Sequence, residues 1–414
     1  MFCCRRGAAA STCSRTSAIG GTNSRRLFSI ISRGGVMVLT RPNSISRRLM
    51  SLDGVILLLV AILLGVGIIT VFSATMLRSA NEFGTPYHYL VRHIVSVLFA
   101  VMIGLGAAIL PLKTLPRLSW PLMFLTIGLL ALVMVPGVGV AHRGATRWLE
   151  FYGFSFQPSE LAKFSLPLFL TSMICAQQNK RHGSAKVLTI TLPLVLIVLA
   201  LVAMEPDYGT TGLLALISGS IYFVAQMRPR HIAALAALAL PSGVCAYRYS
   251  HHFRQRVANF ASYLLDPTNT PWHLKQAFTA MGSGGLFGMG LGKGMQKHLL
   301  LAESFNDFAF AALAEDGGFV AAVIVIALFL TLISRALMLS MSLDIYFARL
   351  LGFGLATSLG LQSFMNISVV VGLMPTTGVS LPFISYGGSG LLANMITVGL
   401  LLSVLRSRTE GKRK

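Results

Sequence analysis

The hydrophobic positions of this chain gather into long runs that are separated by short polar segments. About ten runs are long enough for a membrane-spanning helix, which needs roughly 20 apolar residues. They lie near residues 54–74, 92–111, 117–136, 161–177, 187–204, 209–227, 230–247, 308–335, 347–371 and 386–405. Because backbone polar groups in lipid must find partners within the protein, the pattern predicts an all-α polytopic membrane protein.

One polar interruption is much longer than the others. It covers residues 248–306, between the seventh and eighth runs, and it contains many cations and glycines. The sequence therefore predicts one large loop between helices 7 and 8. The next run carries Glu315 and Asp316 in its first third, which predicts that it enters the membrane as a half-helix before it spans.

The composition agrees with a membrane protein. Of the 414 residues, 54% are hydrophobic and 11% are charged, whereas soluble domains carry roughly 25% charged residues. The net charge of +21 would suit nucleic acid, but the cations lie mostly at run ends and in loops, without a nucleic-acid motif. Anionic lipid headgroups explain them better. The five cysteines show no zinc spacing, so they predict no metal site.

The composition also divides the chain into three segments. Residues 1–52 are rich in arginine and serine and contain no acid. This is typical of an organellar transit peptide, of a disordered cytoplasmic tail, or of an over-extended start with Met37 as the true initiator. Residues 53–406 form the membrane domain, and residues 407–414 form a second basic tail.

The distribution of lysine and arginine predicts which side each loop faces. Short cytoplasmic loops carry an excess of these residues. With both termini in the cytoplasm, the cation-rich short loops fall inside and segment 248–306 falls outside. Carboxylates at membrane depth are costly and usually functional. The candidates on the outer face are therefore Glu160, Asp207, Glu303 and Asp307.

Two of these acids have a structural and a functional interpretation. Asp307 stands just before an apolar run, where it would either cap a helix or take part in chemistry. Glu315 would share its helical face, which favours chemistry. Asp207, in the segment Glu205-Pro206-Asp207, would either cap the next helix or line an outer cavity.

Three further motifs stand near these acids. Lys163 follows Glu160 by three residues, which predicts an ion pair on one helical face, either structural or functional. Segment 282–294 is rich in glycine, so its backbone N–H groups would approach an anion such as pyrophosphate; the alternative is a flexible loop. Segment 375–389 mixes proline, glycine and serine, which predicts a re-entrant outer loop.

Several segments, in this order along the chain, resemble the SEDS family (shape, elongation, division and sporulation). The similarity runs from about Asp53 to Arg406. It includes Gly144-Ala145-Thr146-Arg147-Trp148, Gln157 to Lys163, Pro206-Asp207-Tyr208-Gly209-Thr210, Gln276, Gly282 to Gly292, Gln296-Lys297, Asp307-Phe308 and Leu381 to Ser389. The resemblance implies a membrane glycosyltransferase that polymerises lipid II, the undecaprenyl-pyrophosphate-linked disaccharide peptide. It also implies a class B penicillin-binding protein, a transpeptidase, as partner.

The resemblance assigns the catalytic acid to Asp307 and further functional residues to Glu160, Lys163 and Asp207. A departing pyrophosphate needs positive charge, which nearby cations would supply. The residues expected to bind substrate are Arg147, Glu160, Lys163, Asp207, Arg254, Arg256, Gln276, Lys297, Glu303 and Ser385. The sequence leaves open a divalent cation, Mg²⁺ or Mn²⁺, held by the acids.

The chain departs from the family pattern just before the catalytic position. Ala302, Phe305 and Asn306 replace the usual proline, histidine and threonine. Rival functions are a lipid II flippase, an elongation-type polymerase and a catalytically idle division scaffold. The basic tail and Thr146 favour the division branch of the family. That branch implies the septum of the cell inner membrane and other divisome membrane proteins as partners.

Overall fold

The computed structural model describes residues 52–142, 145–151, 154–177, 183–227, 247–248, 251–294 and 306–411. Some of the features expected from the sequence lie outside these residues. They are the basic tail, the apolar run at 230–247 apart from its last residue, and the site candidates Lys297 and Glu303.

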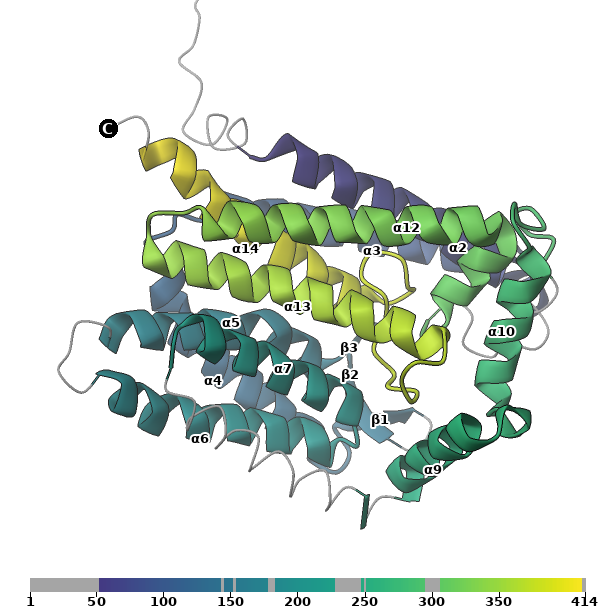
Figure 1. The fold of residues 1–414 in the computed structure, drawn as a ribbon, viewed down its shortest axis with the longest axis horizontal. Coiled ribbons are helices and arrows are strands. Elements are labelled where there is room, and N and C mark those ends of the chain that lie inside the picture. The colour runs from purple at the N-terminus through teal and green to yellow at the C-terminus, as the bar shows by residue number, and fades with distance from the viewer. Residues whose placement is uncertain are drawn as a thin grey trace, which may run out of the picture. The chain divides into compact units, whose positions relative to one another are not determined.

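Nine long helices of the described residues coincide with the other expected runs (Figure 1). They are α2 (Gly54–Phe83), α3 (His88–Ile109), α4 (Leu115–Val133), α5 (Pro158–Gln177), α6 (Gly183–Met204), α7 (Tyr208–Val224), α12 (Ala309–Met341), α13 (Tyr346–Val370) and α14 (Gly388–Gly411). Within the described residues, 7 helices are long and apolar enough to cross a membrane. The prediction of an all-α polytopic membrane protein is confirmed.

Charged contacts tie helix ends together on the side that the sequence predicts to be cytoplasmic. Asp53 caps α2 by accepting the Ile56 N–H at 3.0 Å. The same carboxylate accepts two hydrogen bonds from the Arg335 guanidinium, at 2.9 and 3.1 Å, late in α12. Arg406 of α14 donates to carbonyls at the end of α3. The Asp53–Arg335 contact brings the start of α2 to the last part of α12, and the Arg406 contacts join α14 to the end of α3.

Helix α12 is broken near its start. Gly318 has φ 71° and ψ −171°, a left-handed conformation that glycine adopts without steric cost. The break lies two residues after Asp316 and three after Glu315. The sequence expectation of a half-helix before the span agrees with this geometry.

Two parts of the polar connections have more structure than the sequence indicated. A three-stranded antiparallel sheet, β1 (Gly139–His142), β2 (Ala145–Phe151) and β3 (Phe154–Phe156), follows α4 and was not predicted. The segment expected as one long loop contains α9 (His251–Leu265), the short 3-10 helix η1 (Pro267–Asn269) and α10 (Trp272–Gly284). Helix α10 packs against α12, so the polar segment is fixed to the membrane domain (Figure 1).

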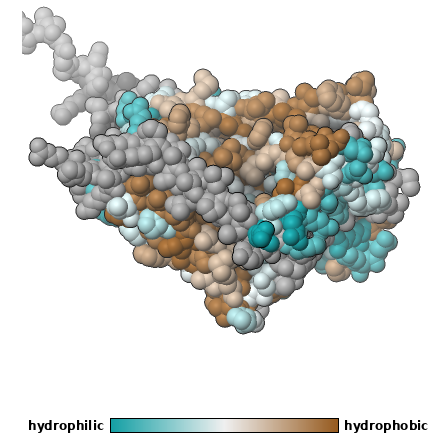
Figure 2. Space-filling model, turned by 60° about the horizontal axis from the view of Figure 1, so that its bottom comes forward, coloured by the Kyte–Doolittle hydropathy of each residue, from teal (hydrophilic) through white to brown (hydrophobic). Residues whose placement is uncertain are grey.

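The buried apolar residues form two clusters. One joins α2, α3, α12, α13 and α14, and the other is centred on α4, α5, α6 and α7. Many large apolar side chains on the spanning helices remain exposed, as expected of a surface that faces lipid. Figure 2 shows one face on which apolar residues cover broad areas, while hydrophilic residues gather toward one side.

Candidate active site

A pocket of about 330 Å³ opens where α9, the start of α10 and two loop segments meet. Asp307 and Phe308 line it from the turn before α12, and Arg256 lines it from α9. The other lining residues are Gln255, Asn259, Phe260, Pro271, His273, Leu274, Met374, Pro375, Thr376 and Gly378. The pocket therefore joins the predicted catalytic acid to one predicted phosphate-binding arginine.

The peptide of Asp307 is held by two side chains that reach it from elsewhere in the chain. Asn366 of α13 donates from Nδ2 to the Asp307 carbonyl at 2.9 Å and to the Val379 carbonyl at 2.8 Å. Ser385 donates to the Asn306 carbonyl at 2.7 Å and accepts the Leu381 N–H at 2.9 Å. Two successive carbonyls of the turn are thus fixed to segment 379–385.

Asp307 lies one residue before the N-cap position of α12. The helix begins at Ala309, Phe308 occupies the N-cap position, and no side chain caps the helix there. Glu315 does not join it in the pocket lining; its carboxylate is fully buried, and a Cβ on Gly294 would collide with it.

Arg256 is the pocket's cation. Its guanidinium donates to the Thr376 carbonyl at 3.2 Å. Partial desolvation beside the pocket and the charge of Arg147 lower the pKa of Arg256, although the side chain is exposed, while the negative charges of Asp307 and Asp207 raise it. These influences indicate that four charged groups lie close together around the pocket and the turn before α7.

That turn carries the second group of predicted site residues. Asp207 caps α7 by accepting the Thr210 N–H at 3.2 Å, so the capping interpretation is confirmed. It also accepts a hydrogen bond from Gln157 at 3.0 Å and lies 3.9 Å from the Arg147 guanidinium. Arg147 donates to the backbone carbonyls of Glu205 and Pro206, which ties β2 to the turn.

Glu205 is an acid that the sequence analysis did not assign to the site. It is 2% exposed, and neither of its carboxyl oxygens has a hydrogen-bond partner. Burial, together with the nearby charge of Asp207, raises its pKa to about 8, although Arg147 opposes the shift. Glu205 is therefore mostly protonated at neutral pH.

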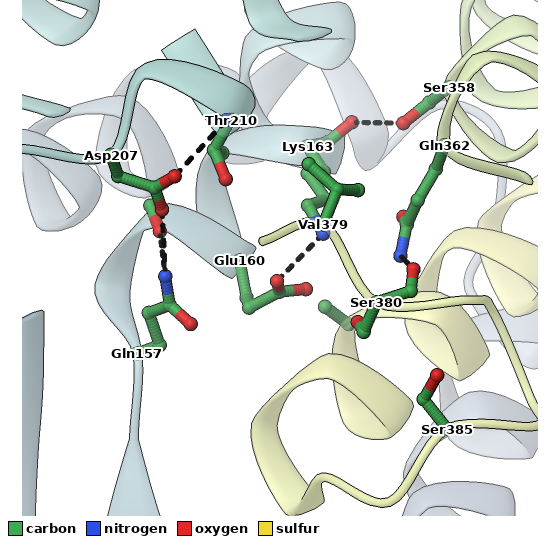
Figure 3. Close-up of polar contacts among 12 residues, drawn as sticks. Gln157, Glu160, Lys163, Asp207, Thr210, Ser358, Gln362, Val379, Ser380 and Ser385 are labelled. Carbon is green, nitrogen blue, oxygen red and sulfur yellow. Dashed lines mark hydrogen bonds and ion pairs between the residues drawn. The ribbon is translucent and has the colours of Figure 1, made fainter. Parts of the chain in front are cut away.

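Glu160 and Lys163 form a buried ion pair in the first turns of α5 (Figure 3). The Lys163 Nζ and the Glu160 Oε1 are 2.7 Å apart, and the two residues are only 2% and 6% exposed. Ser358 donates to the backbone carbonyl of Lys163 at 3.2 Å. The predicted ion pair is confirmed, but neither residue lines the pocket.

Of the other predicted substrate-binding residues, Ser385 acts on the pocket through the Asn306 carbonyl. Gln276 is buried within α10, and Arg254 is exposed on α9; neither lines the pocket. Among the described residues, no group of three or more His, Cys, Asp or Glu side chains is arranged to hold a metal ion.

The glycine-rich segment does not offer its backbone to an anion in the way the sequence suggested. The N–H groups of Gly288, Met289, Gly290 and Gly292 bind acceptors of the protein itself. The glycines instead allow close packing against α12: a Cβ at Gly288 would collide with the Asp316 carbonyl.

Sequence analysis missed the residue that holds Asp307. Asn366 stands four residues after Gln362 in an apolar run, so both amides lie on one helical face. Gln362 donates to the Ser380 carbonyl at 2.9 Å. Polar amides at this spacing in a spanning helix were the available signal, because they need partners within the protein.

Comparisons with known proteins cover most of the chain. Residues 54–410 match the family model described as "Cell cycle protein", that of FtsW, RodA and SpoVE. A "Probable peptidoglycan glycosyltransferase FtsW" of Geobacter sp. (strain M18) is 34% identical over 360 residues, covering 86% of this chain and 98% of the relative. One of Coxiella burnetii, with the same description, is 34% identical over 358 residues, covering 86% and 96%.

Two solved structures have a similar fold. One is described as "Structural coordination of polymerization and crosslinking by a peptidoglycan synthase complex". It has a TM-score of 0.69 and 28% identity, and the match covers 86% of this chain and 98% of that chain. The rod shape determining protein RodA of Thermus thermophilus has a TM-score of 0.64 and 28% identity, with 86% and 97% covered.

Proposed function

The chain belongs to the FtsW, RodA and SpoVE family of cell cycle proteins, and we propose that it is a peptidoglycan glycosyltransferase that polymerises lipid II. The observation that carries the proposal is the pocket in which Asp307 and Arg256 face one ligand volume. An acid beside a cation is what a glycosyl transfer with a phosphate leaving group requires.

Asp307 acts as the general base. It takes the proton of the acceptor sugar's 4-hydroxyl while that oxygen forms a bond to C1 of the donor sugar. The bond between C1 and the pyrophosphate oxygen breaks, and the lipid pyrophosphate leaves with the electron pair. Arg256 in the pocket, with Arg147 nearby, stabilises the charge that develops on the leaving group.

The reaction takes place at the outer face of the cytoplasmic membrane, with both termini in the cytoplasm. Two observations support this topology. The turn that bears Asp307 and the Arg335 ion pair lie at opposite ends of α12, roughly 40 Å apart at 1.5 Å per residue. The short loops on the Arg335 side also carry the lysines and arginines that favour the cytoplasm.

The partner is a class B penicillin-binding protein, and the protein works with other divisome proteins at the septum. The similar fold in a peptidoglycan synthase complex and the FtsW description of the relatives support this assignment. A fluorescent fusion of the full chain tests the location. A septal signal supports division, whereas a signal along the side wall supports an elongation polymerase.

The activity is tested with the purified chain, the transpeptidase partner and labelled lipid II. The wild type should form glycan strands, and Asp307→Ala should form none. Asp266→Ala is the control, because Asp266 is an exposed acid between α9 and η1 that does not line the pocket. Strands from Asp307→Ala at the wild-type rate would refute the role of this acid. Lipid II crossing in liposomes without polymer would support a flippase, and neither activity would support a scaffold.

A further inference from the structure

Residues 285–294, here called the glycine loop, fill the break in α12 with their backbone. Met289 and Gly290 donate to the carbonyls of Glu315 and Asp316 at 3.0 and 3.1 Å. In the other direction, Phe319 and Val320 donate to the carbonyls of Gly285 and Leu286 at 2.9 and 3.2 Å. The groups that the break at Gly318 frees from helical bonding are thus paired with the loop.

The side of the loop that faces away from α12 is apolar and open. Phe287 is 81% exposed, Leu291 is 66% exposed and Leu286 is 64% exposed. Phe319 and Val320, which are hydrogen-bonded to the loop, are also exposed and begin the outward face of α12. The apolar surface of the loop is therefore continuous with the surface of a candidate membrane span.

The height of the loop follows from the two helices that it touches. The Asp53–Arg335 ion pair lies at the far end of α12 from the loop. Because the pair is charged, it lies at the edge of the hydrocarbon on that side or outside the hydrocarbon. Val320 lies about 22 Å along α12 from Arg335, and the hydrocarbon core is about 30 Å thick. Leu286, whose carbonyl accepts a hydrogen bond from the Val320 N–H, therefore lies inside the hydrocarbon.

Helix α2 gives an independent measure of the depth of the glycine loop in the membrane. The Gly292 N–H donates to the Ser73 hydroxyl at 2.9 Å. Ser73 lies about 30 Å along α2 from Asp53, which is the thickness of the hydrocarbon core. Gly292 is thus at the boundary, and the loop descends from there toward Leu286.

We propose that residues 286–291 form a re-entrant loop that is immersed in the leaflet opposite the Asp53–Arg335 pair and binds lipid acyl chains. Irregular backbone is tolerated at this depth only where its polar groups are paired within the protein, as they are here. Lys293, at the end of the loop, is exposed, and its stem passes beside Gly290, so its ammonium group can bind the headgroup phosphates. The loop also shields the buried acids Glu315 and Asp316 from lipid.

The loop anchors the pocket to the membrane surface. It follows the last residue of α10, and residues at the start of α10 line the pocket. Because α10 is packed against α12, immersion of one end fixes the height of the other end above the bilayer.

The test uses the full chain in lipid nanodiscs, with its native cysteines replaced and one nitroxide label introduced through Phe287→Cys. Collision rates are measured with oxygen, which partitions into lipid, and with a water-soluble nickel chelate. Ile324→Cys on the exposed face of α12 is the lipid reference, and Thr268→Cys in the exposed polar turn before α10 is the water reference.

The label at position 287 should collide more often with oxygen than with the nickel chelate, as the label at position 324 should. The label at position 268 should collide more often with the nickel chelate. A nickel preference at position 287 would mean that the loop lies in water and would overturn the proposal. Protection from both reagents would mean that protein, such as a second copy of the chain, covers the loop, which would also overturn it.

Discussion

Asp307 and Glu160 are acids at the beginnings of two helical segments, and their surroundings are opposite. Asp307 lines an open pocket and is positioned through its backbone carbonyl by Asn366. Glu160 is buried, and its Oε1 lies 2.7 Å from the Lys163 Nζ, while its Oε2 has no hydrogen-bond partner. The sequence nominated both as functional acids. The comparison teaches that the two predicted acids are held in different ways, Asp307 through its backbone carbonyl and Glu160 through an ion pair with Lys163.

The largest expected effect concerns the buried pair. Lys163→Met leaves the Glu160 charge buried without its partner, which typically costs about 3–5 kcal/mol of stability. The midpoint of unfolding in detergent should fall strongly. The double variant Glu160→Gln with Lys163→Met should recover most of the loss, because no unpaired charge remains. A single variant as stable as the wild type would show that the pair does not support the fold.

The next effect concerns the orientation of the pocket acid. Asn366→Ala removes the hydrogen bonds to the Asp307 and Val379 carbonyls. A catalytic group misplaced by about 1 Å costs on the order of 10²-fold in rate, so kcat should fall by about that factor with KM little changed. Gln362→Ala is the matched control on the same helix face, since it loses only a bond to Ser380. Equal losses in both variants would remove the special role of Asn366.

A smaller effect should separate two neighbouring arginines of α9. Arg256 lines the pocket and Arg254 does not. Arg256→Ala should reduce kcat/KM for lipid II polymerisation by about tenfold, because a charge-assisted contact to the pyrophosphate is lost. Arg254→Ala should stay within about twofold of the wild type, since only screened long-range attraction changes. The reverse order would show that the ligand lies elsewhere along α9.

A further effect depends on pH. The pKa of Glu205 is raised to about 8 in the folded protein, from an ordinary value of 4.5. The stability that the protonated acid contributes is therefore fully present below pH 4.5 and is lost as the pH rises through about 8. Glu205→Gln should remove this dependence, so its unfolding midpoint should change less than that of the wild type between these pH values. Parallel curves would contradict the raised pKa.

The sequence was sufficient for the long helices of the described residues because their signal is local. A run of about 20 apolar residues is stable in lipid as a helix. The acids near Gly318 also predicted the break in α12. The three-stranded sheet was missed, because its strands are short and have no clear alternation of apolar and polar residues. Helices α9 and α10 were not predicted, because the polar composition of their segment is typical of a loop.

Some residues of the candidate site were predicted from the sequence and others were not. Asp307 and Arg256 could be named from residue type and position, since charged residues beside membrane spans are few. Asn366 was missed: the spacing of the two amides indicated that they need partners, but the partner of Asn366 is 59 positions away in the chain. The anion-binding interpretation of the glycine-rich segment failed for the same reason. Several of its N–H groups donate to acceptors in α12 and α2, which are distant in the sequence.

The most direct test compares binding and chemistry in Asp307→Asn, which keeps the size of the side chain and removes its basicity. Lipid II binding to the purified chain with its transpeptidase partner should stay close to the wild-type affinity. The initial rate of glycan strand formation should fall by about 10²-fold or more, the contribution typical of a general base. A rate within about twofold of the wild type at saturating lipid II would contradict the assignment of Asp307 as the catalytic base.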